Sequence, residues 1–149
     1  MTDYSSLLKL AACEPTSPCS MVTSPASIID SFFEVHKELG FGFREYIYTR
    51  ALELLLIAKG HKVEREVAVM VYFRGEPLAY ERMDMLVDSA VVIENKTREP
   101  LDPDAQGQLF ASLAATNLEV GLVLHFGKKA RFYRVFFENR FKRRNQPCP

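Results

Sequence analysis

Residues 82–96 read RMDMLVDSAVVIENK, and this stretch decides the fold. Apolar residues lie on both sides of Asp88-Ser89, a dipeptide that is typical of a tight turn. The stretch therefore predicts two antiparallel strands, 78–87 and 90–96, joined by a hairpin turn. The second strand is so rich in Val and Ile that we expect it near the middle of a sheet.

Three charged residues interrupt these apolar strands. Glu94 and Lys96 are two residues apart, so their side chains leave the same face of the strand, and the hairpin turn brings Asp84 alongside them. Two carboxylates about 4 Å apart repel each other by roughly 4 kcal/mol at an effective dielectric constant near 20, which favours a shared proton or a bound cation. Mg²⁺ or Mn²⁺ suits such oxygen ligands. The alternative is an ion pair of Lys96 with one of the carboxylates on a solvated sheet face.

The rest of the chain surrounds this hairpin with helices and further strands. Ser24-Pro25 is a typical helix start, glycines follow the first two helical patterns, and residues 63–73 alternate as a strand does. The predicted order is α, α, β, β, β, α, β, β, over residues 25–39, 43–58, 63–73, 78–87, 90–96, 104–116, 120–126 and 130–137.

A second motif precedes the strands. Residues 42–48 read GFREYIY, a full match to G-x-x-E-x-x-Y, while Arg82-Met83-Asp84 is followed after nine intervening residues by Glu94-Asn95-Lys96. With these motifs, residues 28–137 resemble the GxxExxY family, which is placed in the PD-(D/E)XK nuclease superfamily. The resemblance implies a restriction-endonuclease-like α/β core, in which helices flank a mixed central sheet of about five strands.

The same resemblance implies a divalent-metal-dependent nuclease that hydrolyses phosphodiester bonds of DNA or RNA. Asp84 and Glu94 correspond to metal ligands, and Glu45 corresponds to an added acidic ligand from the first core helix. Lys96 corresponds to the catalytic lysine and Gln108 to an auxiliary polar residue. The implied cofactor is Mg²⁺ or Mn²⁺. The alternative function is a non-catalytic module on the same fold that binds nucleic acid or a protein.

Glu45 and Tyr48 lie three residues apart and so share one face of the second predicted helix. We expect Glu45 to point toward the strand carboxylates. Tyr48 has two interpretations: it points there as well, or it packs in the core with its hydroxyl group hydrogen-bonded. The three histidines have no metal-ligand spacing, and we expect structural or surface roles for His36, His61 and His125.

Charge is distributed unevenly along the chain. The 19 basic and 19 acidic residues give a formal net charge of zero, yet residues 128–144 contain eight Lys or Arg against one acid, with aromatic residues between them. Such a segment is typical of a nucleic-acid-binding surface and also of a solvated basic tail. The candidate phosphate-binding residues are Lys128, Lys129, Arg131, Arg134, Arg140, Lys142, Arg143 and Arg144.

A chain of 149 residues, 48% of them hydrophobic, fits one globular domain. We expect a flexible arm over 1–23, the nuclease-like domain over 24–138 and a basic tail over 139–149. Three cysteines near the chain ends, without a CxxC pair, favour a reducing cytoplasmic location, and no segment is apolar enough for a membrane span. The apolar surface expected on the first helix favours a homodimer, through Ile28, Ile29, Phe32 and Phe33.

Overall fold

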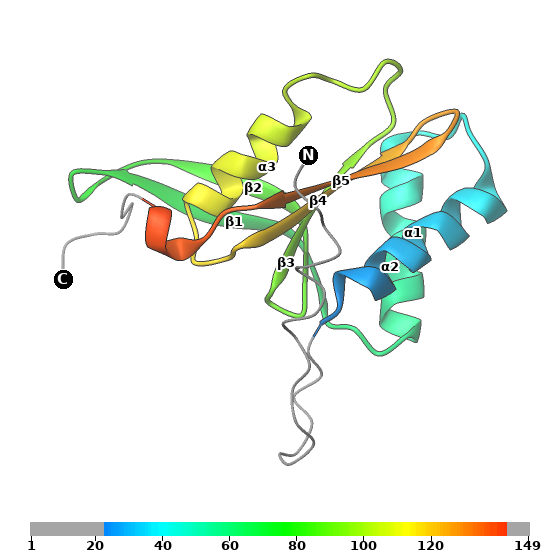
Figure 1. The fold of residues 1–149 in the computed structure, drawn as a ribbon, viewed down its shortest axis with the longest axis horizontal. Coiled ribbons are helices and arrows are strands. Elements are labelled where there is room, and N and C mark those ends of the chain that lie inside the picture. The colour runs from blue at the N-terminus through cyan, green and yellow to red at the C-terminus, as the bar shows by residue number, and fades with distance from the viewer. Residues whose placement is uncertain (1–22, 143–149) are drawn as a thin grey trace, which may run out of the picture.

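A computed structural model describes residues 23–142 of the chain. The observed order of helices and strands is the predicted one, and their ends differ from the prediction by at most two residues. Figure 1 shows the elements in chain order: α1 (Pro25–Leu39), α2 (Glu45–Ala58), β1 (Val63–Phe73), β2 (Glu76–Val87), β3 (Val91–Lys96), α3 (Ala105–Ala114), β4 (Val120–Phe126), β5 (Ala130–Phe136) and the short 3-10 helix η2 (Asn139–Phe141).

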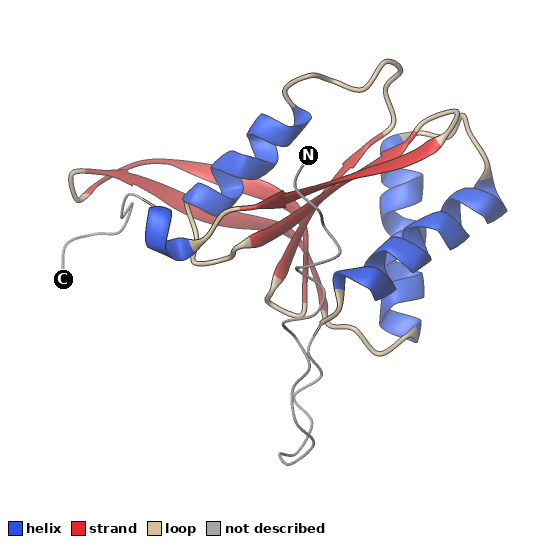
Figure 2. Cartoon of the chain, in the orientation of Figure 1, coloured by secondary structure: helices blue, strands red, loops and turns tan. Residues whose placement is uncertain are grey.

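The five strands of this region form one mixed sheet in the order β1-β2-β3-β4-β5. Neighbouring strands are antiparallel except β3 and β4, which are parallel and connected through α3. Alternate residues of β3 and β4 pack on opposite sides, against α1 and α2 on one face and against α3 on the other (Figure 2). The expected α/β class, a five-stranded mixed sheet flanked by helices, is therefore confirmed. Among the described residues, no helix has the length and apolar character needed to cross a membrane.

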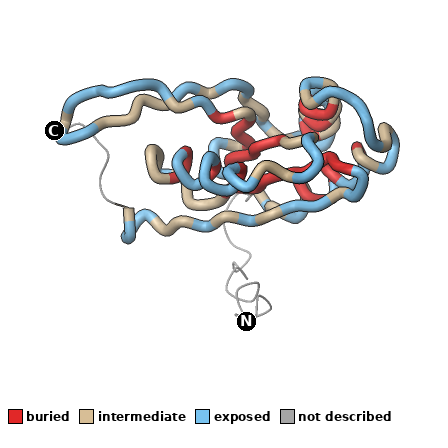
Figure 3. Tube along the Cα trace, turned by 90° about the horizontal axis from the view of Figure 1, so that it is seen from above, coloured by how far each residue is buried: buried red, intermediate tan, exposed pale blue. Residues whose placement is uncertain are grey.

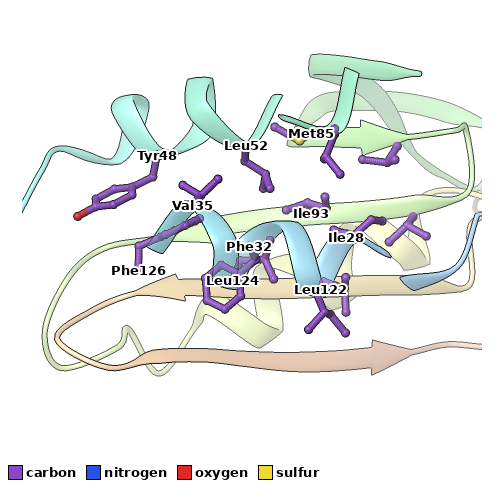
Figure 4. Close-up of a cluster of buried hydrophobic side chains, with 14 residues drawn as sticks. Ile28, Phe32, Val35, Tyr48, Leu52, Met85, Ile93, Leu122, Leu124 and Phe126 are labelled. Atoms are coloured by element: carbon purple, nitrogen blue, oxygen red, sulfur yellow. The ribbon is translucent and has the colours of Figure 1, made fainter. Parts of the chain in front are cut away.

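The larger core lies between the sheet and the helix pair α1 and α2 (Figure 4). At its centre the fully buried rings of Tyr48 and Phe126 stack with their centroids 4.6 Å apart. Phe32 meets Phe126 edge-on at 4.8 Å. The hydroxyl group of Tyr48 donates to the carbonyl of Gly40 at 2.6 Å and accepts from the amide of Phe43 at 3.3 Å. Of the two interpretations of Tyr48, the core position is the one observed.

The apolar face of α1 is used inside the molecule. Ile28, Ile29 and Phe32 are buried against the sheet and α2, and only Phe33 remains 42% exposed, with its ring against Phe132. The apolar surplus on which a dimer through this helix was expected is therefore absent. The helix itself begins as expected, because the Ser24 hydroxyl accepts from the amide of Ala26 and Pro25 occupies the first turn.

On the other face, α3 packs closely on β4. A Cβ atom at Gly121 would lie 2.7 Å from the side chain of Leu109, so only glycine lets the helix approach this near. The smaller core formed there contains Leu109, Leu113, Val92 and Val123. The glycine thus fixes the distance between the crossover helix and the two parallel strands.

The start of α1 is tied to the β2–β3 turn by a hydrogen-bond cluster around Asp88. Its carboxylate accepts from the Thr23 hydroxyl at 2.5 Å, from the Lys62 amide at 2.7 Å and from Nδ1 of His61 at 2.7 Å. Nε2 of His61 in turn contacts the Ser27 hydroxyl at 2.8 Å. Burial opposes the ionised form, but these donors outweigh it and hold the pKa of Asp88 below its usual range.

The other two histidines also contact the main chain. Nε2 of His36 lies 2.8 Å from the carbonyl of Gly127, and Nε2 of His125 lies 2.9 Å from the carbonyl of Arg98. His125 is 2% exposed, and its Nδ1 has no hydrogen-bond partner among the described residues.

The hairpin of β1 and β2 extends well beyond the helices, and Figure 3 shows that burial decreases toward its tip. The tip turn uses Arg74 and Gly75, both at positive φ, as a two-residue turn between right-twisted strands requires. Phe73, Leu78 and Tyr80 are 59%, 63% and 70% exposed near the tip. The hairpin therefore carries large apolar side chains into solvent.

Candidate active site

The hairpin turn at Asp88-Ser89 sets the register that brings the two strand carboxylates together. Met85 of β2 is paired with Ile93 of β3, and one further step in this register places Asp84 opposite Glu94. The carboxylate of Asp84 accepts a hydrogen bond of 3.1 Å from the amide of Asn95. The expected juxtaposition of the two acids is thus observed.

Lys96 closes the group on β3. Its Nζ lies 2.7 Å from Oε1 of Glu94, and the Lys96 and Glu94 side chains are only 18% and 11% exposed. Burial raises the pKa of Glu94, and the ion pair with Lys96 only partly offsets it. Burial disfavours the Lys96 ammonium, but its hydrogen bond to Glu94 and the neighbouring carboxylates outweigh this effect and raise the pKa of Lys96. Lys96 is therefore a cation near neutral pH.

Glu45 reaches the same group from the first residue of α2. Burial raises the pKa of its carboxyl group, and the negative charge of Asp84 acts in the same direction. Lys96 and a hydrogen bond from the main chain at Thr97 act against this rise. Three carboxylates from α2, β2 and β3 therefore lie within electrostatic reach of one lysine, and Glu45 lies where the sequence predicted it.

Two residues that the sequence analysis did not single out connect these elements. Asn95 is fully buried, and its side-chain amide donates to the Thr49 hydroxyl at 3.2 Å. Thr49 donates in turn to the carbonyl of Glu45 at 3.0 Å. The main-chain amide of Asn95 also donates to the carboxylate of Asp84, so Asn95 connects β2 and β3 to the first turn of α2. The signal in the sequence that could have identified Asn95 is an uncharged polar residue at the end of an apolar strand.

At the level of Asp84, the side chains of β1 and β2 switch the face of the sheet toward which they point. Met85 packs with α1 and α2, whereas Met83, two residues earlier, packs with α3, although a regular strand would place both on one side. Val63 and Val67 of β1 show the same change. Between these two residues, Glu66 adopts a positive φ of 51°, a left-handed conformation that is rare for this residue type. Backbone strain of this kind gathers at functional sites.

Gln108, predicted as an auxiliary polar residue, lies on the exposed side of α3. Its main-chain groups bond within the helix, and among residues 23–142 its side chain makes no hydrogen bond to the acidic group. The structure therefore brings Glu45, Asp84, Glu94 and Lys96 together and leaves Gln108 outside this set.

The basic segment does not form one surface. Lys128 and Lys129 follow β4, and Arg131 lies in register with His125, which is itself in register with Lys96, so these cations flank the acidic group along the sheet. Arg134 pairs with Leu122, whose side chain faces α1 and α2, and so points to the opposite face.

The cations after β5 have structural contacts. Arg140 forms an ion pair with Glu138, and Lys142 donates to the carbonyls of Thr116 and Leu118 beyond α3. Burial lowers the pKa of Lys142. The remaining predicted phosphate contacts, Arg143 and Arg144, lie outside the described residues, as do residues 1–22 and the three cysteines.

The acidic group has the oxygen ligands that a divalent metal ion requires. Among residues 23–142, no three His, Cys, Asp or Glu side chains form a group that could hold a metal by themselves. Mg²⁺ and Mn²⁺, however, are commonly held by one or two carboxylates, with water and substrate phosphates completing the shell. Asp84 and Glu94 supply that number of carboxylates, and a cation between them would relieve the repulsion that contributes to the raised pKa of Glu94. The donor set therefore fits a hard divalent cation.

Comparisons with known proteins agree with this fold. The sequence model of the PD-(D/E)XK nuclease superfamily matches residues 23–135. Among solved structures, the chain is similar to the one described as "Crystal structure of SSO0001", with a TM-score of 0.50, 15% sequence identity and 78% of each chain covered. At that identity the similarity shows the fold alone. The curated proteins include no match. Since the superfamily match spans most of the chain and all of the acidic group, the chain belongs to the PD-(D/E)XK nuclease superfamily.

Proposed function

We propose that this chain is a divalent-metal-dependent nuclease that hydrolyses phosphodiester bonds of nucleic acid. The observation that carries the proposal is the convergence of Asp84, Glu94 and Glu45 on Lys96, from three different elements. Burying these carboxylates lowers the stability of the fold, and such unfavourable burial is typical of functional sites. We also propose membership of the GxxExxY family, on the motif over residues 42–48.

Asp84 and Glu94 would hold Mg²⁺ or Mn²⁺, with Glu45 as an added acidic ligand. When bound, such an ion polarises a phosphoryl oxygen and lowers the pKa of a coordinated water. In the hydrolysis, the water oxygen forms a bond to phosphorus and gives up one proton to solvent. The bond to the leaving ester oxygen breaks, and that oxygen takes up a proton from solvent.

The protein residues orient and stabilise this reaction. The Lys96 ammonium lies against Glu94 at 2.7 Å and is placed to offset the negative charge that develops on the phosphoryl group. Because the ammonium group is held against the Glu94 carboxylate, its role is electrostatic. Lys128, Lys129 and Arg131 flank the site along the sheet and would contact phosphates of the substrate.

A second candidate function is a non-catalytic module that binds nucleic acid or a protein. The contact between Lys96 and Glu94 favours it, because this ion pair neutralises one of the two strand carboxylates. In such a module the acidic group would bind no divalent cation, and the basic residues along the sheet would provide the affinity.

Calorimetric titration of Mn²⁺, run beside a cleavage assay on mixed DNA and RNA, separates the two functions. For the nuclease, we expect Asp84→Asn to lose both cation binding and cleavage, and Lys96→Met to lose cleavage by about 10²-fold or more while cation binding persists. Glu76→Gln removes an exposed acid of the hairpin and serves as the control. A wild-type protein that binds nucleic acid but neither binds Mn²⁺ nor cleaves would support the non-catalytic binding module instead of the nuclease.

A further inference from the structure

The outer edge of β1 has no neighbouring strand among the described residues. β1 is the first strand of the sheet and pairs with β2 alone, so the amide and carbonyl groups along its other edge point away from the sheet. The stretch 67–73 lies between Glu66 and Arg74, which have positive φ values of 51° and 49°, and its pairing with β2 shifts register between Val71 and Tyr72. An open edge of this length is a template for pairing with another strand.

The chemistry of this edge favours a protein strand over nucleic acid. Residues 67–73 read VAVMVYF and contain no charge, and the adjacent β2 adds the exposed side chains of Leu78 and Tyr80. The whole hairpin, residues 63–87, has three arginines and five acidic residues. A net negative, apolar surface repels a polyanion, in contrast to the basic segment over 128–144.

We propose that β1 pairs antiparallel with β1 of a second copy of this chain, about a two-fold axis at Met70. This register pairs the complete stretch 67–73 with itself, because Met70 lies at the centre of the seven residues between Glu66 and Arg74. It joins two five-stranded sheets into one sheet of ten strands. An interface of this kind is closed, because each copy uses its single open β1 edge.

Charge complementarity supports this register. With Met70 on the axis, Glu66 of one copy lies opposite Arg74 of the second copy, and the symmetry repeats this contact at the other end of the paired stretch. Within one chain the two residues are eight positions apart on the same strand, about 26 Å at 3.3 Å per residue, so they cannot form an ion pair with each other. An ion pair between them is therefore possible only between copies. Within one copy, the guanidinium group of Arg74 lies over the Phe73 ring, 5.2 Å from its centroid.

Charge reversal tests the proposal, with sedimentation equilibrium and light scattering to measure the dissociation constant of the dimer. We expect Glu66→Arg and Arg74→Glu each to weaken the dimer roughly ten-fold, because each change places like charges opposite each other at two symmetric positions. The double variant, in which both contacts are restored with the charges exchanged, should return to near the wild-type constant. Met70→Lys, which sets two ammonium groups at the axis, should abolish the dimer.

Thermal unfolding of each variant serves to show that the fold is intact. A wild-type protein that stays monomeric up to high micromolar concentrations would overturn the proposal, and would indicate that another segment covers the edge. A dimer that Met70→Lys leaves unchanged would place the interface elsewhere. A dimer that the double reversal fails to restore would overturn the register.

Discussion

The two ends of strands β1 and β2 differ in what covers them. Beyond Asp84, Met85 and Val87 are fully buried between the sheet and the helices, whereas Leu78 and Tyr80 at the other end of the same strand are more than 60% exposed. The candidate active site lies at the boundary between this packed body and the open hairpin. The packed end of the sheet therefore holds the acids in place, while the open end leaves an unpaired edge for a partner strand.

The largest expected effect tests the packed body. Phe126→Ala removes a fully buried ring that contacts both Tyr48 and Phe32, and we expect a loss of about 3–5 kcal/mol in the free energy of unfolding. Tyr80→Ala, on the hairpin, removes a ring that is 70% exposed, and we expect a change within about 0.5 kcal/mol. Urea denaturation of both variants measures the difference. Similar losses in the two variants would contradict the division into a packed body and an open hairpin.

The sequence predicted the body well because its signals there are local and redundant. Ser24-Pro25, the glycines after α1 and α2, and the alternating residues 63–73 each predict one element, and the structure has all of these elements. Within β1 the alternation itself is interrupted at Glu66, so Val63 and Val67 pack on opposite faces. Asp84 and Glu94 could be predicted for a similar reason, because a charged residue within an apolar strand is recognisable from the sequence alone. Glu45 needed the motif around it, because its approach to the sheet depends on how α2 packs.

The remaining features depend on long-range packing and could not be predicted. The link from Asn95 through Thr49 joins residues 46 positions apart, and nothing local to either residue indicates it. The strand change at Glu66 occurs at an ordinary glutamate, where neither a glycine nor an asparagine marks a positive φ. The basic segment looked uniform in sequence, yet alternation along β5 sends Arg131 and Arg134 to opposite faces.

A smaller effect is expected at the tie between α1 and the sheet. Asp88→Asn keeps a residue that tolerates the positive φ of 50° but removes the charge that accepts from Thr23, His61 and Lys62. We expect a loss of about 1–2 kcal/mol in the free energy of unfolding at neutral pH.

The pH dependence of this loss has a definite sign. The pKa of Asp88 is lowered in the folded state, so the stabilisation is complete above the ordinary Asp value of 3.8 and disappears as the pH falls through the lower folded value. Urea titrations of the wild type and the variant at pH 7 and at successively lower pH should converge in the acid range. A difference that stays constant with pH would show that the charge of Asp88 has no part in it.

At the boundary itself, removing a charge should stabilise the fold. Burial raises the pKa of Asp84, and only part of this is offset by the amide of Asn95 and by Lys96, so the ionised carboxylate at neutral pH costs stability. We expect Asp84→Asn to increase the free energy of unfolding by about 0.5–2 kcal/mol, as is common when a residue kept for function is neutralised. Urea denaturation without divalent cations measures it, and a destabilised variant would contradict the strain assigned to this acid.

The smallest effect separates the backbone of Glu66 from its charge. Glu66→Ala and Glu66→Gly both remove the carboxylate, whose charge helps to raise the pKa of Asp84, but only glycine adopts the positive φ of 51° without a steric penalty. We therefore expect the glycine variant to be more stable than the alanine variant by up to about 1 kcal/mol. At Ala68, two residues further along β1, Ala68→Gly should show the opposite order and cost about 0.5–1 kcal/mol. The two sites lie on one strand. If the glycine variant is less stable than the alanine variant by the same free energy at both sites, β1 runs regularly from the packed body into the hairpin, and the strain at Glu66 is contradicted.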